Sequence, residues 1–204
     1  MPETALPAGA SASQDAEITA ALGTRSIVLI GMMGAGKSTI GRRLAARLRL
    51  PFLDADIEIE AAAGMSIPDI FETQGEPYFR DGEARVIARL LDGGPAVLAT
   101  GGGAFMDPAT RAEIARRGVS VWLRADIDTL LTRVARRSNR PLLKQGNPRA
   151  VLTELIERRY PIYAEADITV DSGDGAADLT ASRTIAALAA CPRALLPPEP
   201  DGEP

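Results

Sequence analysis

Histidine is absent from this 204-residue sequence, and cysteine occurs once, at Cys191. Without histidine, the chain cannot build a Ser-His or Cys-His catalytic pair or a histidine-ligated zinc site. A single cysteine excludes an intrachain disulfide and favours a reducing compartment. Aromatic residues make up only 4% of the chain, against 46% hydrophobic residues. We therefore expect a core built mainly from Ala, Leu, Ile and Val.

Long apolar segments are missing as well. No run approaches the roughly 18 apolar residues that a membrane helix requires, and residues 1–17 lack the basic and apolar regions of a secretory signal. These absences predict a cytoplasmic protein without a membrane partner. The net charge of −4 argues against a nucleic-acid partner, because such binding requires a basic surface. Residues 133–159 nevertheless hold seven arginines and one lysine, a local excess that suits anionic ligands.

The middle of the chain alternates between short apolar runs and segments with helical spacing. The apolar runs predict five strands, at residues 26–30, 52–53, 96–100, 119–123 and 168–170. Spacing and capping residues predict helices at 38–50, 77–91, 109–117, 126–137, 149–165 and 178–190, and a short one that opens at Ser66. This order indicates an α/β fold, a five-stranded parallel sheet flanked by helices in a three-layer sandwich. Ligands of such sheets bind at the carboxyl ends of the strands.

The two ends of the chain differ in composition from this middle part. Residues 1–24 are rich in Ala, Ser, Pro and Gly without periodicity, and residues 192–204 contain the stretch PPEPDGEP. We predict a disordered head at 1–24, one domain at 25–191 and a disordered Pro-rich tail at 192–204. Residues 138–148 are polar and carry Gly and Pro, which predicts a mobile lid within the domain.

Residues 31–38, GMMGAGKS, match the phosphate-binding pattern G-x-x-x-x-G-K-[ST] between a predicted strand and a predicted helix. The glycines let backbone N–H groups surround phosphate oxygens, and the helix N-terminus adds partial positive charge. Lys37 would reach the β- and γ-phosphates of ATP, and Ser38 would supply an oxygen to Mg²⁺. The predicted ATP-binding residues of this loop are Gly34, Ala35, Gly36, Lys37, Ser38 and Thr39.

GTPases, motors and kinases share this loop, so the loop alone leaves the class open. A GTPase switch also needs an Asn-Lys-x-Asp guanine motif and an Asp-x-x-Gly switch motif, and neither occurs in the sequence. A nucleotide-dependent switch is therefore the rival interpretation to an enzyme. The two differ in whether a small acceptor molecule stimulates ATP turnover.

Other motifs lie at the predicted carboxyl ends of strands. Asp54 and Asp56 follow the second strand, where period two would send both side chains to the same side. One carboxylate would sit near Mg²⁺ through water, and the other would meet an acceptor hydroxyl. Three glycines at 101–103 follow a buried strand, as expected where a backbone approaches a ligand closely. Taken singly, the two acids could belong to a solvated turn. Arg80 could lie on a solvated helix face, and Arg159 could complement a helix dipole.

As a set, these motifs resemble the shikimate kinases. The segments GMMGAGKST, DAD, FRDGE, GGGA, NRPLL and ERRYPIY occur in the family's order and spacing over about residues 26–172. The resemblance implies ATP-dependent phosphorylation of the 3-hydroxyl of shikimate, which gives shikimate 3-phosphate and ADP in aromatic amino acid biosynthesis. It also implies Mg²⁺ as cofactor and the nucleoside-monophosphate-kinase-like form of the P-loop fold, and we expect a monomer. The alternative enzyme is a related P-loop kinase that acts on gluconate or a nucleoside monophosphate.

The resemblance also implies roles for individual residues. Asp56 would hold two shikimate hydroxyls, including the one that is phosphorylated, and Asp54 would contact Mg²⁺ through water. Two guanidinium forks facing one planar carboxylate give oriented hydrogen bonds that lysine could not match. The implied shikimate-binding residues are Asp56, Arg80, Gly101, Gly102, Gly103 and Arg159.

The phosphate end of the site carries further implied roles. Arg140, in the predicted lid, would close onto the phosphates and complete a catalytic set with Lys37 and Asp56, while Arg133 would stack on adenine. The loop at residues 171–175 does not match the family's second adenine-contacting segment. Tyr160 and Tyr163 are predicted to be packing residues, and Trp122 to belong to the core.

Overall fold

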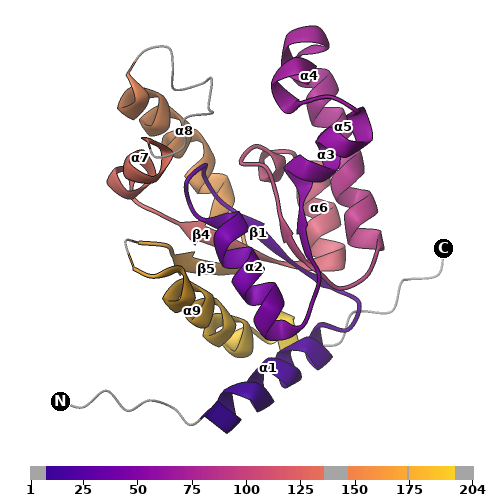
Figure 1. Cartoon of the computed structure of the whole chain (residues 1–204), viewed down its shortest axis with the longest axis vertical. Helices are drawn as coiled ribbons and strands as arrows, with labels where there is room; N and C mark the ends of the chain where they lie inside the picture. Colours follow the sequence, from indigo (N-terminus) through magenta and orange to yellow (C-terminus); the bar gives the residue numbers. More distant parts are fainter. Residues whose placement is uncertain (1–7, 136–146, 174, 196–204) are drawn as a thin grey trace.

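The computed structural model describes residues 8–135, 147–173 and 175–195. A five-stranded parallel sheet crosses the molecule in the order β2-β3-β1-β4-β5 (Figure 1). Its strands are β1 (Ser26–Ile30), β2 (Phe52–Asp54), β3 (Val97–Ala99), β4 (Gly118–Arg124) and β5 (Ile168–Asp171). The five predicted strands and their parallel arrangement are confirmed, with each boundary within one residue of the prediction.

Helices cover both faces of the sheet, which confirms the three-layer sandwich. In Figure 1, α2 and α9 lie together over one face with α1 against them, while α5 and α6 pack together on the other side. None of the helices in the described ranges is long and apolar enough to cross a membrane. The helices are α1 (Ala8–Leu22), α2 (Lys37–Leu48), α3 (Ala55–Ala63), α4 (Ile67–Thr73), α5 (Gly75–Asp92), η1 (a 3₁₀ turn, Ala104–Met106), α6 (Pro108–Arg117), α7 (Ile127–Ala135), α8 (Pro148–Tyr163), α9 (Ala177–Ala190) and α10 (Pro192–Leu195).

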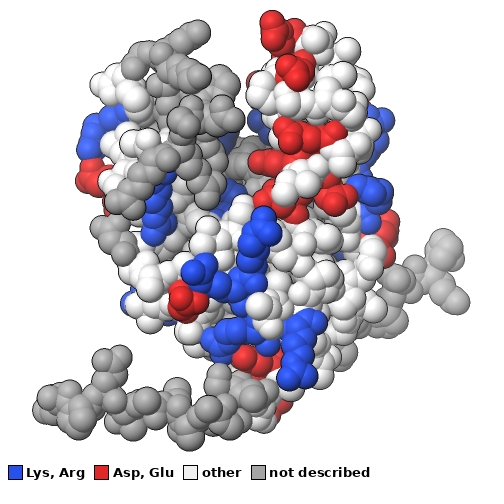
Figure 2. Space-filling model, in the orientation of Figure 1, with Lys and Arg blue, Asp and Glu red and all other residues white. Residues whose placement is uncertain are grey.

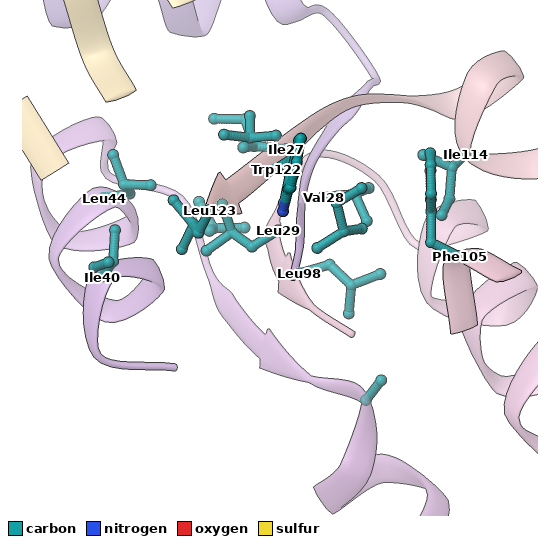
Figure 3. Packing of buried hydrophobic residues seen from close by; sticks show 14 of the residues in the cluster. Ile27, Val28, Leu29, Ile40, Leu44, Leu98, Phe105, Ile114, Trp122 and Leu123 are labelled. Carbon is teal, nitrogen blue, oxygen red and sulfur yellow. The ribbon is translucent and has the colours of Figure 1, made fainter. Parts of the chain in front are cut away.

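The core is aliphatic, as the composition predicts, and it forms two layers, one on each face of the sheet. Alternate residues of a strand point to opposite faces. Leu29 of β1 therefore faces Ile40 and Leu44 of α2, whereas Val28 faces Ile114 of α6 (Figure 3). All of these side chains are buried, and Trp122 is buried with them, as predicted.

The prediction of a disordered head at 1–24 is wrong for the residues that form α1. Ile18 and Leu22, one helical turn apart, are buried at 1% and 0% exposure and anchor this helix to the rest of the protein. Residues 192–195 of the predicted tail are helical too, in α10. The side chain of buried Arg25 joins the two helices, because it donates to backbone carbonyls at the C-terminal ends of α1 and α10: those of Ala21, Leu22, Arg193 and Ala194.

One local prediction near the site also needs correction. Asp54 and Asp56 do not share a strand, because Asp56 lies in the first turn of α3. The side chain of Asp54 accepts the backbone N–H of Asp56 and thereby caps that helix. Most of the predicted lid at 138–148 lies outside the described residues, but its end does not. Asn147 caps α8, which begins at Pro148.

Candidate active site

The carboxyl ends of β1, β2 and β3 open into one cleft of 1040 Å³. Acidic side chains gather over α3, α4 and α5, and basic side chains over α2 (Figure 2). The structure brings together at this cleft nearly all the predicted site residues: Gly34, Gly36, Lys37, Ser38, Thr39, Asp54, Asp56, Arg80, Gly101, Gly102, Gly103, Arg133 and Arg159. Ala35 is an exception, because it is buried outside the lining and its N–H donates to the carbonyl of Met32 at 3.1 Å. Arg140 lies outside the described residues.

The phosphate-binding loop turns through two glycines in the left-handed region. Gly34 and Gly36 have φ of +83° and +95°, which other residues rarely adopt. Gly36 directly precedes α2, so the N-terminus of this helix opens on the cleft and offers its partial positive charge to an anion. The ammonium of Lys37 lies over the same loop, where it donates to the carbonyls of Gly31 at 2.8 Å and Met32 at 3.1 Å.

Two side chains with oxygen atoms that could bind a metal, those of Ser38 and Asp54, lie together beside this loop. The hydroxyl of Ser38 donates to Oδ2 of Asp54 at 2.8 Å. No group of three or more Asp, Glu, His or Cys residues able to hold a metal occurs in the described part of the chain. Mg²⁺ suits this arrangement, because it prefers hard oxygen ligands and usually binds through one or two protein groups together with water and phosphate.

The opposite wall carries Arg80, which projects from α5. Its guanidinium donates to Oε2 of Glu83 at 2.6 Å and to Oε1 of Glu76 at 3.1 Å. Glu83 is only 2% exposed, and its Oε1 has no hydrogen-bond partner among the described residues. Burial raises the pKa of Glu83, while the charge of Arg80 opposes this shift and nearby Asp56 adds to it. Glu83 was not predicted from the sequence, although its position three residues after Arg80 on one helix was a usable signal.

Arg159 completes this wall from the C-terminal part of α8. It is 9% exposed, and its Nε has no hydrogen-bond partner in the described ranges. A buried cation with an unpaired donor is costly unless an anion joins it. An acidic ligand in the cleft would meet this requirement.

The triple glycine runs between these charged side chains. A Cβ on Gly101 would lie 2.4 Å from Oε1 of Glu83, one on Gly102 would lie 3.0 Å from Nη1 of Arg159, and one on Gly103 would lie 2.4 Å from Nη1 of Arg80. None of the three glycines has a positive φ. These positions therefore require glycine for space, so that the charged side chains can approach the backbone.

Arg133 and the segment after β5 form the other end of the cleft. Nη1 of Arg133 donates to Oγ of Ser172 at 3.1 Å, and Nη2 donates to the carbonyl of Gly173. Ser172 is fully buried, and its hydroxyl donates to the carbonyl of Ala35 at 2.7 Å. The loop at 171–175, which does not match the family pattern, is thus tied through Ser172 and Gly173 to both Arg133 and the phosphate-binding loop. Its place after the carboxyl end of a strand was the available signal.

The chain is similar to known proteins over most of its length. The shikimate kinase family model matches residues 33–189. Shikimate kinase from Bradyrhizobium diazoefficiens is 64% identical over 174 residues, which cover 85% of this chain and 83% of the relative. Shikimate kinase from Rhodopseudomonas palustris is 61% identical over 189 residues, covering 92% and 93%.

A solved structure matches as well. Shikimate kinase from Acinetobacter baumannii in complex with shikimate superposes with a TM-score of 0.77 at 41% identity, covering 82% of this chain and 94% of that one. The family model, the close relatives and the fold lead to the same assignment. This chain belongs to the shikimate kinase family.

Proposed function

We propose that the carboxylate of shikimate binds between Arg80 and Arg159 and that Asp56 holds the 3-hydroxyl toward the terminal phosphate of ATP. The overall reaction follows from the family: ATP phosphorylates the 3-hydroxyl of shikimate to give shikimate 3-phosphate and ADP. The observation that carries the proposed placement is the burial of Arg159 with an unpaired Nε beside the cleft. A ring acid would supply the missing anion, whereas a neutral sugar would leave the buried Arg159 cation without one, which is energetically unfavourable.

The phosphate-binding loop and α2 support the placement of ATP at the other end of the cleft. Lys37 and the N-terminus of α2 would hold the β- and γ-phosphates, while Arg133 would contact the base together with the Ser172–Gly173 segment. Ser38, and Asp54 through water, would hold Mg²⁺, which supplies further positive charge to the phosphates. Phosphoryl transfer depends mainly on positioning and charge stabilisation, so these groups would act by holding the phosphates in place and balancing their charge, without forming covalent bonds to them.

Asp56 is the proposed orienting residue for the acceptor hydroxyl. It lines the cleft in the first turn of α3, and a Cβ on Gly101 would lie 3.3 Å from its Oδ1. Its carboxylate would accept the hydroxyl hydrogen bond and then the proton as transfer proceeds. Asp56→Asn should lower kcat by orders of magnitude, while the Kd for ATP stays within about twofold. A nearly active variant would refute this role.

One assay tests the acceptor directly. ADP release by the purified protein should be measured with shikimate, gluconate or AMP as acceptor, each at the same ATP and Mg²⁺ concentrations. Only shikimate should stimulate turnover, and omission of Mg²⁺ should abolish it. Turnover with gluconate or AMP would favour a related P-loop kinase, and no acceptor-dependent turnover would favour a switch.

We also propose that the protein acts as a cytoplasmic monomer. In the described residues, a single chain contributes both the phosphate-binding loop and the acceptor wall of the cleft. A second copy is therefore not needed to complete the proposed site. Light scattering at enzyme concentrations that support turnover should give the mass of one chain, 21.5 kDa, and a stable dimer would contradict the proposal.

A further inference from the structure

The carbonyls of the triple glycine are all anchored, but by different means. The Gly101 carbonyl accepts the N–H of Ala104 at 3.2 Å, and the Gly103 carbonyl accepts the N–H of Met106 at 3.0 Å. These two bonds belong to the turn that leads into η1. The Gly102 carbonyl instead accepts the hydroxyl of Tyr163, which comes from the C-terminal end of α8. In the described part of the protein, the middle carbonyl is thus the one that depends on a side chain.

This bond sets the direction of a backbone donor. The Gly102–Gly103 peptide is trans, as are all the described peptide bonds, so its C=O and N–H point in opposite directions. Tyr163 is fully buried and does not line the cleft, whereas Gly102 and Gly103 do. The carbonyl of Gly102 therefore points toward α8, and the N–H of Gly103, which also lines the cleft, points away from α8. Without its hydroxyl partner, this peptide would be free to rotate between two glycines.

The ring of Tyr163 has little freedom of its own. It packs against Phe105 and Trp122, with ring centroids 6.5 and 6.0 Å away. Arg159, one helical turn earlier on α8, lies beside this hydroxyl: a Cβ on Gly102 would lie 3.0 Å from Nη1 of Arg159 and 3.8 Å from the Tyr163 hydroxyl. Burial raises the pKa of this hydroxyl, although Arg159 opposes the shift, so the group stays protonated and remains a donor at neutral pH. The Tyr163 hydroxyl thus holds the glycine backbone beside the buried arginine.

We infer that Tyr163 is a positioning residue for the acceptor: its hydroxyl holds the Gly102–Gly103 peptide beside Arg159 in the arrangement that receives a carboxylate. This inference rests on the proposed acceptor site at Arg80 and Arg159. Tyr163 touches neither substrate and acts through the groups that do. It therefore has a functional role beyond the packing that the sequence suggests for it.

A pair of matched variants tests this role. Tyr163→Phe keeps the ring and removes only the hydroxyl. Tyr160→Phe, three residues earlier on α8, removes a hydroxyl that donates to the carbonyl of Ala125, away from the triple glycine. Tyr163→Phe should raise the KM for shikimate about tenfold, the effect of one hydrogen bond of about 1.4 kcal/mol, with the KM for ATP unchanged. Tyr160→Phe should leave both KM values within about twofold of the wild type.

Two further measurements separate the possible failures. The penalty in kcat/KM caused by Tyr163→Phe should be much smaller with the neutral methyl ester of shikimate, because the ester lacks the carboxylate that these groups receive. Arg159→Lys tests the underlying site. If Arg159→Lys raises the KM for shikimate and Tyr163→Phe behaves like Tyr160→Phe, Tyr163 only packs, and the inference is wrong. If Arg159→Lys also has no effect, the proposed carboxylate site is wrong, and the inference falls with it.

Discussion

Replacing Gly103 with alanine would place a Cβ 2.4 Å from Nη1 of Arg80 and 2.6 Å from its Cζ. Ordinary van der Waals contact begins at 3.4 Å, so the guanidinium must retreat by about 1 Å. The backbone at this position can accommodate alanine, because Gly103 has φ −97° and ψ −19°, which alanine adopts readily. The substitution therefore acts on the position of Arg80.

A displacement of about 1 Å in a substrate-positioning group can cost up to about 100-fold in rate or affinity. We expect Gly103→Ala to raise the KM for shikimate about 10- to 100-fold, which corresponds to about 1.4–2.7 kcal/mol. The KM for ATP should stay within about twofold, since Arg80 lies on the acceptor wall. Stability should change by less than about 1 kcal/mol, because the displaced atoms are the end of a flexible side chain.

Gly82 supplies the matched control. It lies on α5 two residues after Arg80, and a Cβ there would meet no atom within 4 Å. Gly82→Ala should leave both KM values unchanged and stabilise the helix by about 0.5–1 kcal/mol. Steady-state kinetics with each substrate varied, together with urea unfolding, measure these effects. An unchanged KM for shikimate in Gly103→Ala would refute the placement of the carboxylate at Arg80.

Three more substitutions have expected outcomes. Arg80→Lys keeps the charge and loses the fork, so the KM for shikimate should rise at least about tenfold; an unchanged KM would remove Arg80 from the site. Ser172→Ala removes a hydrogen-bond acceptor of Arg133, so the KM for ATP should rise about threefold to tenfold at constant KM for shikimate. A raised KM for shikimate at constant KM for ATP would contradict the assignment of this loop to the ATP end of the cleft. Asp107→Ala removes the cap of α6 and should cost about 1 kcal/mol in urea unfolding at pH 7. Hydrogen bonds from Thr110 lower the pKa of Asp107 below 3.8. The stability that the cap contributes is therefore present above pH 3.8 and is lost as the pH falls through the folded-state pKa. If the difference in unfolding free energy between wild type and Asp107→Ala does not shrink in acid, the capping role is refuted.

Local patterns were sufficient for much of the fold. Each strand contains a short stretch of mostly apolar residues, and the glycine-rich loop between β1 and α2 has a fixed spacing. The head was mispredicted because its alanine-rich sequence lacks an extended periodic face. The spacing of Ile18 and Leu22 was the available signal for a helix, but two apolar residues indicate a packed helix only once the surface that buries them is known. Likewise, α3 was missed because Asp54 and Asp56 were both assigned to the end of the second strand, although Asp is a common helix cap.

The missed parts of the site depend on contacts between distant segments. Tyr163 meets Gly102 across 61 positions of sequence, and Arg133 meets Ser172 across 39. Neither pairing leaves a trace in the spacing of nearby residues. The motifs therefore identified the groups at the cleft, but the structure was needed to find the groups behind them.

Arg25 has a practical consequence for anyone who prepares a shortened enzyme. A piece cut to the family match at 33–189, or to the predicted domain at 25–191, would lose α1 and α10. In the longer piece, the guanidinium would keep its place beside β1 without the helix ends that solvate it in the intact chain. Such a fragment should melt at a lower temperature and aggregate more readily than the 204-residue chain. Expression trials should therefore retain both ends of the chain.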